Sequence, residues 1–162
     1  MKLAAFFLIP AMAYAQEFAQ GWMGEYEHAS KQIHQLLEAT PEAKLSWRPA
    51  PGIRSTAEVY GHIIQGNYFL LRQAGIASPG NSKDMPKSFS SKAEMAKWLK
   101  DSEDAVRAAY PKADMKKAVK FLGKDTTVEG VFLRLLVHSH EHMGQLIAYA
   151  RSTGVVPPWS AK

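Results

Sequence analysis

A chain of 162 residues, 46% of them hydrophobic, is long enough for one domain with a substantial core and too short for two comfortable ones. Its formal charge is +5, with 20 lysines and arginines against 15 acidic residues. The lysines form loose groups, the densest between Lys112 and Lys124, and this distribution does not suit a nucleic-acid-binding protein. Because the sequence has no cysteine, disulfide bonds, cysteine-linked lipid anchors and thiol nucleophiles are excluded.

Residues 1–15 have the layout of a secretory signal peptide. Lys2 precedes the apolar run Leu3–Ile9, and Ala13 and Ala15 supply the small residues of a cleavage site. The run is far shorter than the roughly 20 residues that span a bilayer. We therefore expect cleavage after Ala15, export to the periplasm or the extracellular space without a membrane anchor, and one domain over residues 16–162. The alternative is a buried or frayed turn of helix.

The next segments predict two helices joined by an extended loop. Apolar residues at spacings of three and four indicate a first helix over about Glu17–Leu37, which ends before a proline. Two prolines and a glycine then predict the loop. Ser55 or Thr56 caps the second helix, with Glu58 placed to complete a capping box with Ser55, and its apolar side continues to about Ala74.

Two further helices follow a long connection over Gly75–Phe89. Ser91 and Glu94 predict a capping box at the start of the third helix, which ends before Pro111. The fourth helix is expected over about Thr127–Thr153, followed by glycine and prolines.

No β-sheet is expected. The segment KAVKFLGKDTTVEGVF has room for one short strand, but no second strand is available to pair with it. Four amphipathic helices in one small domain bury their apolar sides most simply as a four-helix bundle, so the predicted fold class is all-α. The long second connection allows a crossover.

Three of the six histidines fall within one stretch of five residues, 138–142, in the fourth helix. Each helical residue advances by about 100°, so His138 and His142 share a face while His140 leaves the helix about 160° away. Histidines at this spacing can chelate one metal ion, but a pair is a weak site without a third ligand. His62, on the second helix, is the candidate. The alternative interpretation of His62 is a core histidine whose hydrogen bonds are made within the protein. The alternative interpretation of the three C-terminal histidines is a polar stretch on a helix surface.

Two segments, RPAPGIRSTAEVYGHIIQGNYFLL and HSHEHMGQLIAYARSTGVVPPWS, resemble the DinB-like (YfiT-type) superfamily. The most specific features are the histidine on the second helix and the H-x-x-x-H that leads into Gly-Gln on the fourth. The resemblance covers nearly all of residues 16–162. It implies a four-helix bundle with a crossed, up-down-down-up connection, often homodimeric, that binds a divalent metal through three histidines. The matching positions are His62, His138 and His142.

Some members of that superfamily carry out transfer or isomerisation with low-molecular-weight thiols. Many relatives have adjacent histidines at the end of the motif and a basic residue before the glycine. This chain instead has Glu141-His142-Met143-Gly144, which lacks the basic side chain.

Two other residues share the faces of these histidines. Gln145 falls within about 60° of both histidines of the pair, where it would hydrogen-bond a ligand imidazole or a water on the metal. Glu58 precedes His62 by one turn and is the candidate general base, with its capping role as the alternative. Glu141 is expected to be a surface or rim carboxylate, and His28 and His34 are expected at the surface.

The sequence therefore predicts an exported metal-binding bundle with metal-dependent hydrolase or transferase activity on a small molecule. Three neutral imidazoles would leave coordination positions open for water or substrate. Zinc and nickel suit imidazole ligands, whereas ferrous iron normally takes a carboxylate as well. The alternative is a non-enzymatic protein that binds a metal or a small molecule.

Overall fold

The structure is a computed structural model that describes residues 21–160. Within this range the chain forms four long helices: α2 (Gly21–Ala39), α3 (Thr56–Gln73), α4 (Lys92–Ala109) and α5 (Val128–Ser152). The predicted signal peptide and the start of the predicted first helix lie outside the described residues. Every helix that the structure describes is too short or too polar to span a bilayer.

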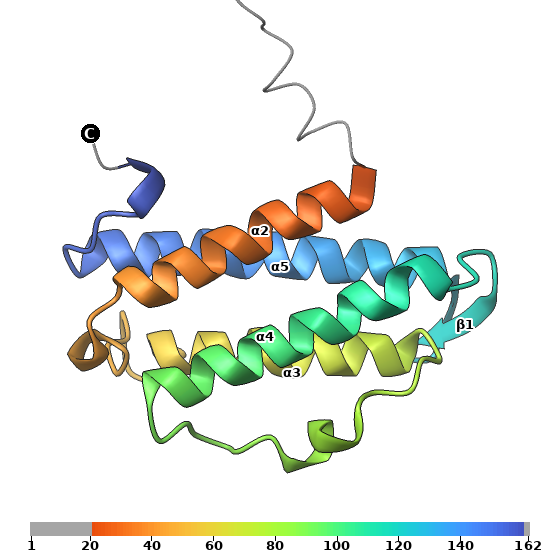
Figure 1. Ribbon diagram of the computed structural model, residues 1–162, viewed down its shortest axis with the longest axis horizontal. Helices are drawn as coiled ribbons and strands as arrows, with labels where there is room; N and C mark the ends of the chain where they lie inside the picture. Colours follow the sequence, from red (N-terminus) through yellow and green to blue (C-terminus); the bar gives the residue numbers. More distant parts are fainter. Residues whose placement is uncertain (1–20, 161–162) are drawn as a thin grey trace, which may run out of the picture.

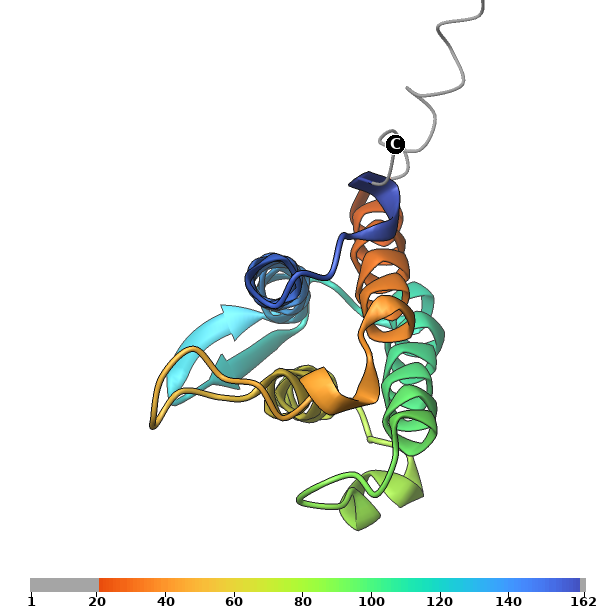
Figure 2. The ribbon, with the colours of Figure 1, turned by 90° about the vertical axis from the view of Figure 1, so that its left-hand side faces the viewer.

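The four helices form a bundle with a crossed connection. α2 and α5 run in one direction and α3 and α4 in the other (Figure 1). α3 packs against both α4 and α5, while α2 packs against α5 and α4, as the end-on view shows (Figure 2). The connection from α3 to α4 runs back along the length of α3 and contains the short 3₁₀-helix η2 (Gly80–Asp84). The predicted all-α, up-down-down-up bundle is confirmed.

Local capping sets where the helices begin. Ser55 Oγ accepts a hydrogen bond from Glu58 N at 3.2 Å, and the Glu58 carboxylate accepts one from Ser55 N at 2.6 Å. This is the predicted capping box of α3. At α4 only half of the predicted box forms, because the Glu94 carboxylate accepts from Ser90 N and Oγ rather than from Ser91 N.

The expectation that no strand pairing occurs is wrong. β1 (Ala118–Phe121) and β2 (Lys124–Thr127) form an antiparallel hairpin just before α5. Both residues of its turn have positive φ, 49° at Leu122 and 82° at Gly123, which is the backbone of a tight two-residue hairpin turn. The partner strand was contained in the same segment, and leucine at a left-handed position is an uncommon turn signal.

The bundle core consists of two clusters of buried apolar side chains. One surrounds Tyr60 and Leu99, and the other surrounds Tyr26 and Phe132. The shorter 3₁₀ turns at η1 (Glu42–Lys44), η3 (Tyr110–Lys112) and η4 (Pro158–Ser160) link or follow the helices.

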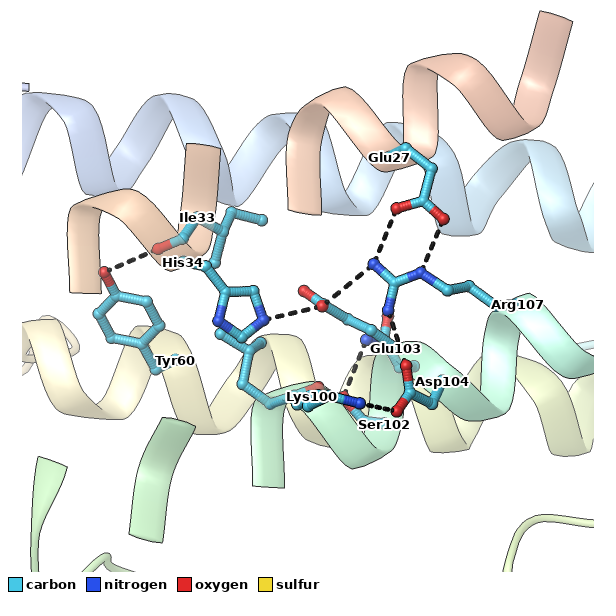
Figure 3. A network of polar contacts seen from close by, with 11 residues as sticks. Glu27, Ile33, His34, Tyr60, Lys100, Ser102, Glu103, Asp104 and Arg107 are labelled. Atoms are coloured by element: carbon cyan, nitrogen blue, oxygen red, sulfur yellow. Dashed lines mark hydrogen bonds and ion pairs between the residues drawn. The ribbon is translucent and has the colours of Figure 1, made fainter. Parts of the chain in front are cut away.

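A polar network joins α2 to α4 (Figure 3). Glu103 is only 2% exposed, and its carboxylate lies 2.9 Å from His34 Nε2 and 3.5 Å from the Arg107 guanidinium. Arg107 also donates two hydrogen bonds to the Glu27 carboxylate, at 2.7 and 2.9 Å. His34 was expected at the surface, and its side chain is 30% exposed, but its ring also contacts the buried Glu103 carboxylate, which needs such polar partners. We assign this network to helix packing.

Candidate metal centre

The three histidines singled out by the sequence lie together between α3 and α5. One ring nitrogen from each of His62, His138 and His142 lies within 4.8 Å of the other two. The ring centroids are 4.5–4.9 Å apart. The group contains no carboxylate, and among the described residues it is the cluster whose ligand atoms are close enough to share one ion.

The spacing of the ring nitrogens matches shared coordination. His62 Nε2 and His138 Nε2 are 3.2 Å apart. Two nitrogens that each lie 2.0–2.1 Å from one tetrahedral ion are about 3.3 Å apart. Three imidazoles without a carboxylate are also a donor set that zinc and nickel accept. The residues present therefore fit a divalent metal ion.

Burial keeps the imidazoles of His62 and His138 uncharged. Desolvation is the largest cause that lowers the pKa of His62 to about 4, and the positive charge of Arg54 is the next cause. Desolvation also lowers the pKa of His138 to about 3, with His142 and His62 as the next causes. Near neutral pH both rings are neutral, and each has a nitrogen lone pair to offer to a metal.

His138 reaches His62 because α3 has a glycine at the point of contact. Gly66 lies one turn after His62, and a Cβ atom built on it would stand 2.3 Å from Cε1 of His138 and 2.9 Å from Nδ1. That Nδ1 is buried and has no hydrogen-bond partner in the described residues. This role of Gly66 was not predicted from the sequence. The available signal was a glycine four residues after a histidine inside an apolar helix.

A chain of hydrogen bonds orients His142. Its Nδ1 lies 2.8 Å from Gln145 Oε1, and Gln145 Nε2 donates to the Tyr149 hydroxyl at 2.9 Å. Tyr149 in turn donates to the backbone oxygen of Arg54 at 3.2 Å. With its amide oxygen toward the ring, Gln145 accepts the proton of Nδ1, and His142 keeps Nε2 free as the metal-facing nitrogen. Gln145 thus makes the imidazole contact expected from the helical phase, whereas the part of Tyr149 in this chain was not predicted from the sequence.

The carboxylates near the cluster already have partners. Glu58 is exposed and ion-paired with Arg48 at 3.2 Å. Its hydrogen bond from Ser55 N and the contact with Arg48 hold its pKa below the usual value. Glu141 is exposed and lies 3.3 Å from Arg134, in agreement with a rim position. A catalytic role for Glu58 stays a prediction, and its capping role is observed.

His140 lies apart from the cluster. Its Nε2 is 3.3 Å from the backbone oxygen of Glu25 on α2. The helical phase predicted this separation from His138 and His142.

A cavity of about 580 Å³ is lined by one of the three histidines, His62. It lies between α3 and the connection to α4. Its volume is in the range of small-molecule sites. A molecule in this cavity would therefore lie next to one of the three imidazoles.

Comparison with known proteins places these observations in a family. A family model described as the DinB superfamily matches residues 25–146. A crystal structure of a DinB-like protein from Bacillus cereus is similar, with a TM-score of 0.75, 22% identity, and coverage of 86% of this chain and 95% of that one. A DinB-like protein from Bacillus subtilis has a TM-score of 0.63 and 15% identity, with 83% and 92% coverage. None of the curated proteins compared with the chain matches it.

Proposed function

The chain belongs to the DinB superfamily, and on that premise we propose that it binds one divalent metal ion through His62, His138 and His142. The observation that carries the proposal is the approach of these three imidazoles from two helices to within 4.8 Å of one another. The low pKa values of His62 and His138 and the 3.2 Å separation of their Nε2 atoms support it. Zinc and nickel are the ions that this donor set favours.

We further propose a metal-dependent hydrolase or transferase reaction on a small molecule. The ion would polarise a substrate oxygen and lower the pKa of a coordinated water. Gln145 holds the ring of His142, and Gly66 leaves room for that of His138, so both nitrogens stay aimed at a common point. The cavity beside His62 would hold the substrate.

A non-enzymatic metal- or small-molecule-binding protein is the second candidate. The observation in its favour is that Glu58, the candidate base, is held by Ser55 and Arg48. Metal analysis of the purified protein, followed by a screen of hydrolase and thiol-transfer substrates, separates the two. Bound metal with turnover supports the enzyme, and bound metal without turnover supports the binding protein. The absence of metal affinity contradicts the enzyme and the metal-binding form of the second candidate, and leaves only a protein that binds a small molecule without metal.

Export and dimerisation are also part of the proposal. Export rests on the layout of residues 1–15, and an intact mass from the native host that still includes them would contradict it. A homodimer rests on the family resemblance. Light scattering at micromolar concentration should give twice the mass of the chain, and a monomeric mass would remove this part of the proposal.

A further inference from the structure

The crossed connection between α3 and α4 forms one wall of the cavity beside His62 and contributes apolar side chains to it. Met85 and Phe89 of that connection line it together with Gly61 of α3. A Cβ atom on Gly61 would lie 3.4 Å from the Phe89 ring, so the glycine lets the connection pack close to the helix. The apolar part of a small molecule would find a surface on these side chains.

The rim of the cavity is cationic. Four basic side chains line it, and in the described part of the chain none of them has an ion-pair or hydrogen-bond partner: Arg54, Arg72, Lys83 and Lys87. The acidic residue in the lining is Glu58, whose charge is already balanced by Arg48. Unpaired cations around an apolar surface favour a ligand with negative charge.

Arg54 connects the cavity to the proposed metal centre. Arg54 and His62 both line the cavity. The backbone oxygen of Arg54 accepts the hydrogen bond from Tyr149, the last member of the chain that begins at His142. His142 and the backbone of Arg54 are therefore joined by one chain of hydrogen bonds, while the Arg54 guanidinium is exposed and has no partner among the described residues.

We propose that this cavity holds the substrate of the metal centre, and that Arg54 recognises an anionic group, a carboxylate or a phosphate, on a molecule whose apolar part lies against Met85 and Phe89. This inference rests on the metal-binding function proposed above. The planar guanidinium can donate two parallel hydrogen bonds to either anion, which would set the orientation of the molecule beside His62.

The test measures the binding of three probes to the zinc-loaded protein by calorimetry. 4-Phenylbutyrate carries a carboxylate, 3-phenylpropyl phosphate a phosphate, and 4-phenylbutanol has a similar apolar part without charge. At least one anion should bind about ten-fold or more tightly than the alcohol, as expected for a charge-assisted contact. The tighter anion identifies the chemical class of the substrate.

Matched arginine variants locate the contact. Arg54→Gln should reduce anion affinity about ten-fold, toward that of the alcohol, with unchanged metal content. Arg151→Gln removes the same charge from an exposed position on α5 outside the cavity, and it should bind the anions like the wild type. Equal affinities in the two variants, or an alcohol that binds as tightly as both anions, would overturn the inference.

The same titrations with chelator-treated protein separate this inference from the metal function. Anion binding that requires the metal but not Arg54 would mean that the anion coordinates the metal directly. This result would overturn the role of Arg54 and leave the proposed metal binding intact. If the wild type binds neither zinc nor nickel, the proposed function fails. Anion binding that depends on Arg54 would in that case still support the anion site.

Discussion

His138 lies directly against Gly66, with its Cε1 atom 2.3 Å from the place where a Cβ atom on that residue would be. The contact joins the middle of α5 to α3 one turn beyond His62. Because Gly66 has no side chain, the His138 ring fits against α3 with its Nε2 3.2 Å from His62 Nε2. A residue with no ligand atom in its side chain thus determines where a proposed ligand lies.

Gly66→Ala should therefore abolish tight metal binding without unfolding the bundle. The new methyl group cannot coexist with the present position of the imidazole, so the ring must move away from its two partners. In a helix interior, alanine is more favourable than glycine by about 1 kcal/mol, which offsets part of the strain. Metal content and circular dichroism of the purified variant measure the two effects.

Gly144→Ala is the matched control. Gly144 lies in the interior of α5, two residues after His142, and a Cβ atom there would meet nothing within 4 Å. This variant should keep wild-type metal content and equal or greater thermal stability. A normal metal content in Gly66→Ala would show that the close contact does not position His138.

Removal of each histidine should distinguish ligands from neighbours. His62→Ala, His138→Ala and His142→Ala should each lose stoichiometric metal, because two imidazoles compete poorly with buffer ligands. His140→Ala should retain it, because that side chain contacts Glu25 on α2 instead. Elemental analysis after dialysis gives the comparison. Similar behaviour of all four variants, or normal binding by His62→Ala, would contradict the three-histidine site.

Gln145→Ala should keep the fold but weaken metal binding roughly 10–100-fold, which is the usual effect of removing a residue that hydrogen-bonds to a metal ligand. The variant removes the 2.8 Å contact that holds the His142 ring and selects its tautomer. Competition with a chromogenic chelator measures the affinity.

Tyr149→Phe provides the contrast. It removes the hydroxyl between Gln145 and Arg54 but leaves the contact of Gln145 with His142 in place. Its metal affinity should stay within a few-fold of wild type, because Tyr149 hydrogen-bonds to Gln145 and not to a histidine ring. Equal losses in Gln145→Ala and Tyr149→Phe would mean that the whole chain, rather than one contact, supports the ring.

The metal-free protein should lose stability as the pH falls from about 6.5 toward 4. The pKa of His62 is about 4 and that of His138 about 3 in the folded chain, against about 6.5 when unfolded. Between these values the unfolded chain binds more protons, so the free energy of unfolding decreases with falling pH. Thermal melts in the presence of a chelator should show a smaller decrease for the double variant His62→Ala/His138→Ala. An equal decrease would contradict the low pKa values.

The local features of this protein could be predicted from the sequence. The four helices follow from apolar spacing, and the cap of α3 follows from Ser55 and Glu58. The shared face of His138 and His142, and the separate direction of His140, follow from the advance of about 100° per residue. Each of these depends on residues less than two helical turns apart, where backbone geometry alone decides which side chains are neighbours.

The contacts between elements were decided by the tertiary structure. His62 and His138 are 76 positions apart, and their meeting depends on how closely α3 and α5 pack at Gly66. The hydrogen bond from Tyr149 to Arg54 crosses 95 positions, and no periodic pattern reports it. The cavity exists because the connection between α3 and α4 crosses back along α3. Such contacts depend on interhelix distance and on the path of a loop, which sequence spacing does not determine, whereas backbone geometry within each helix determines its faces.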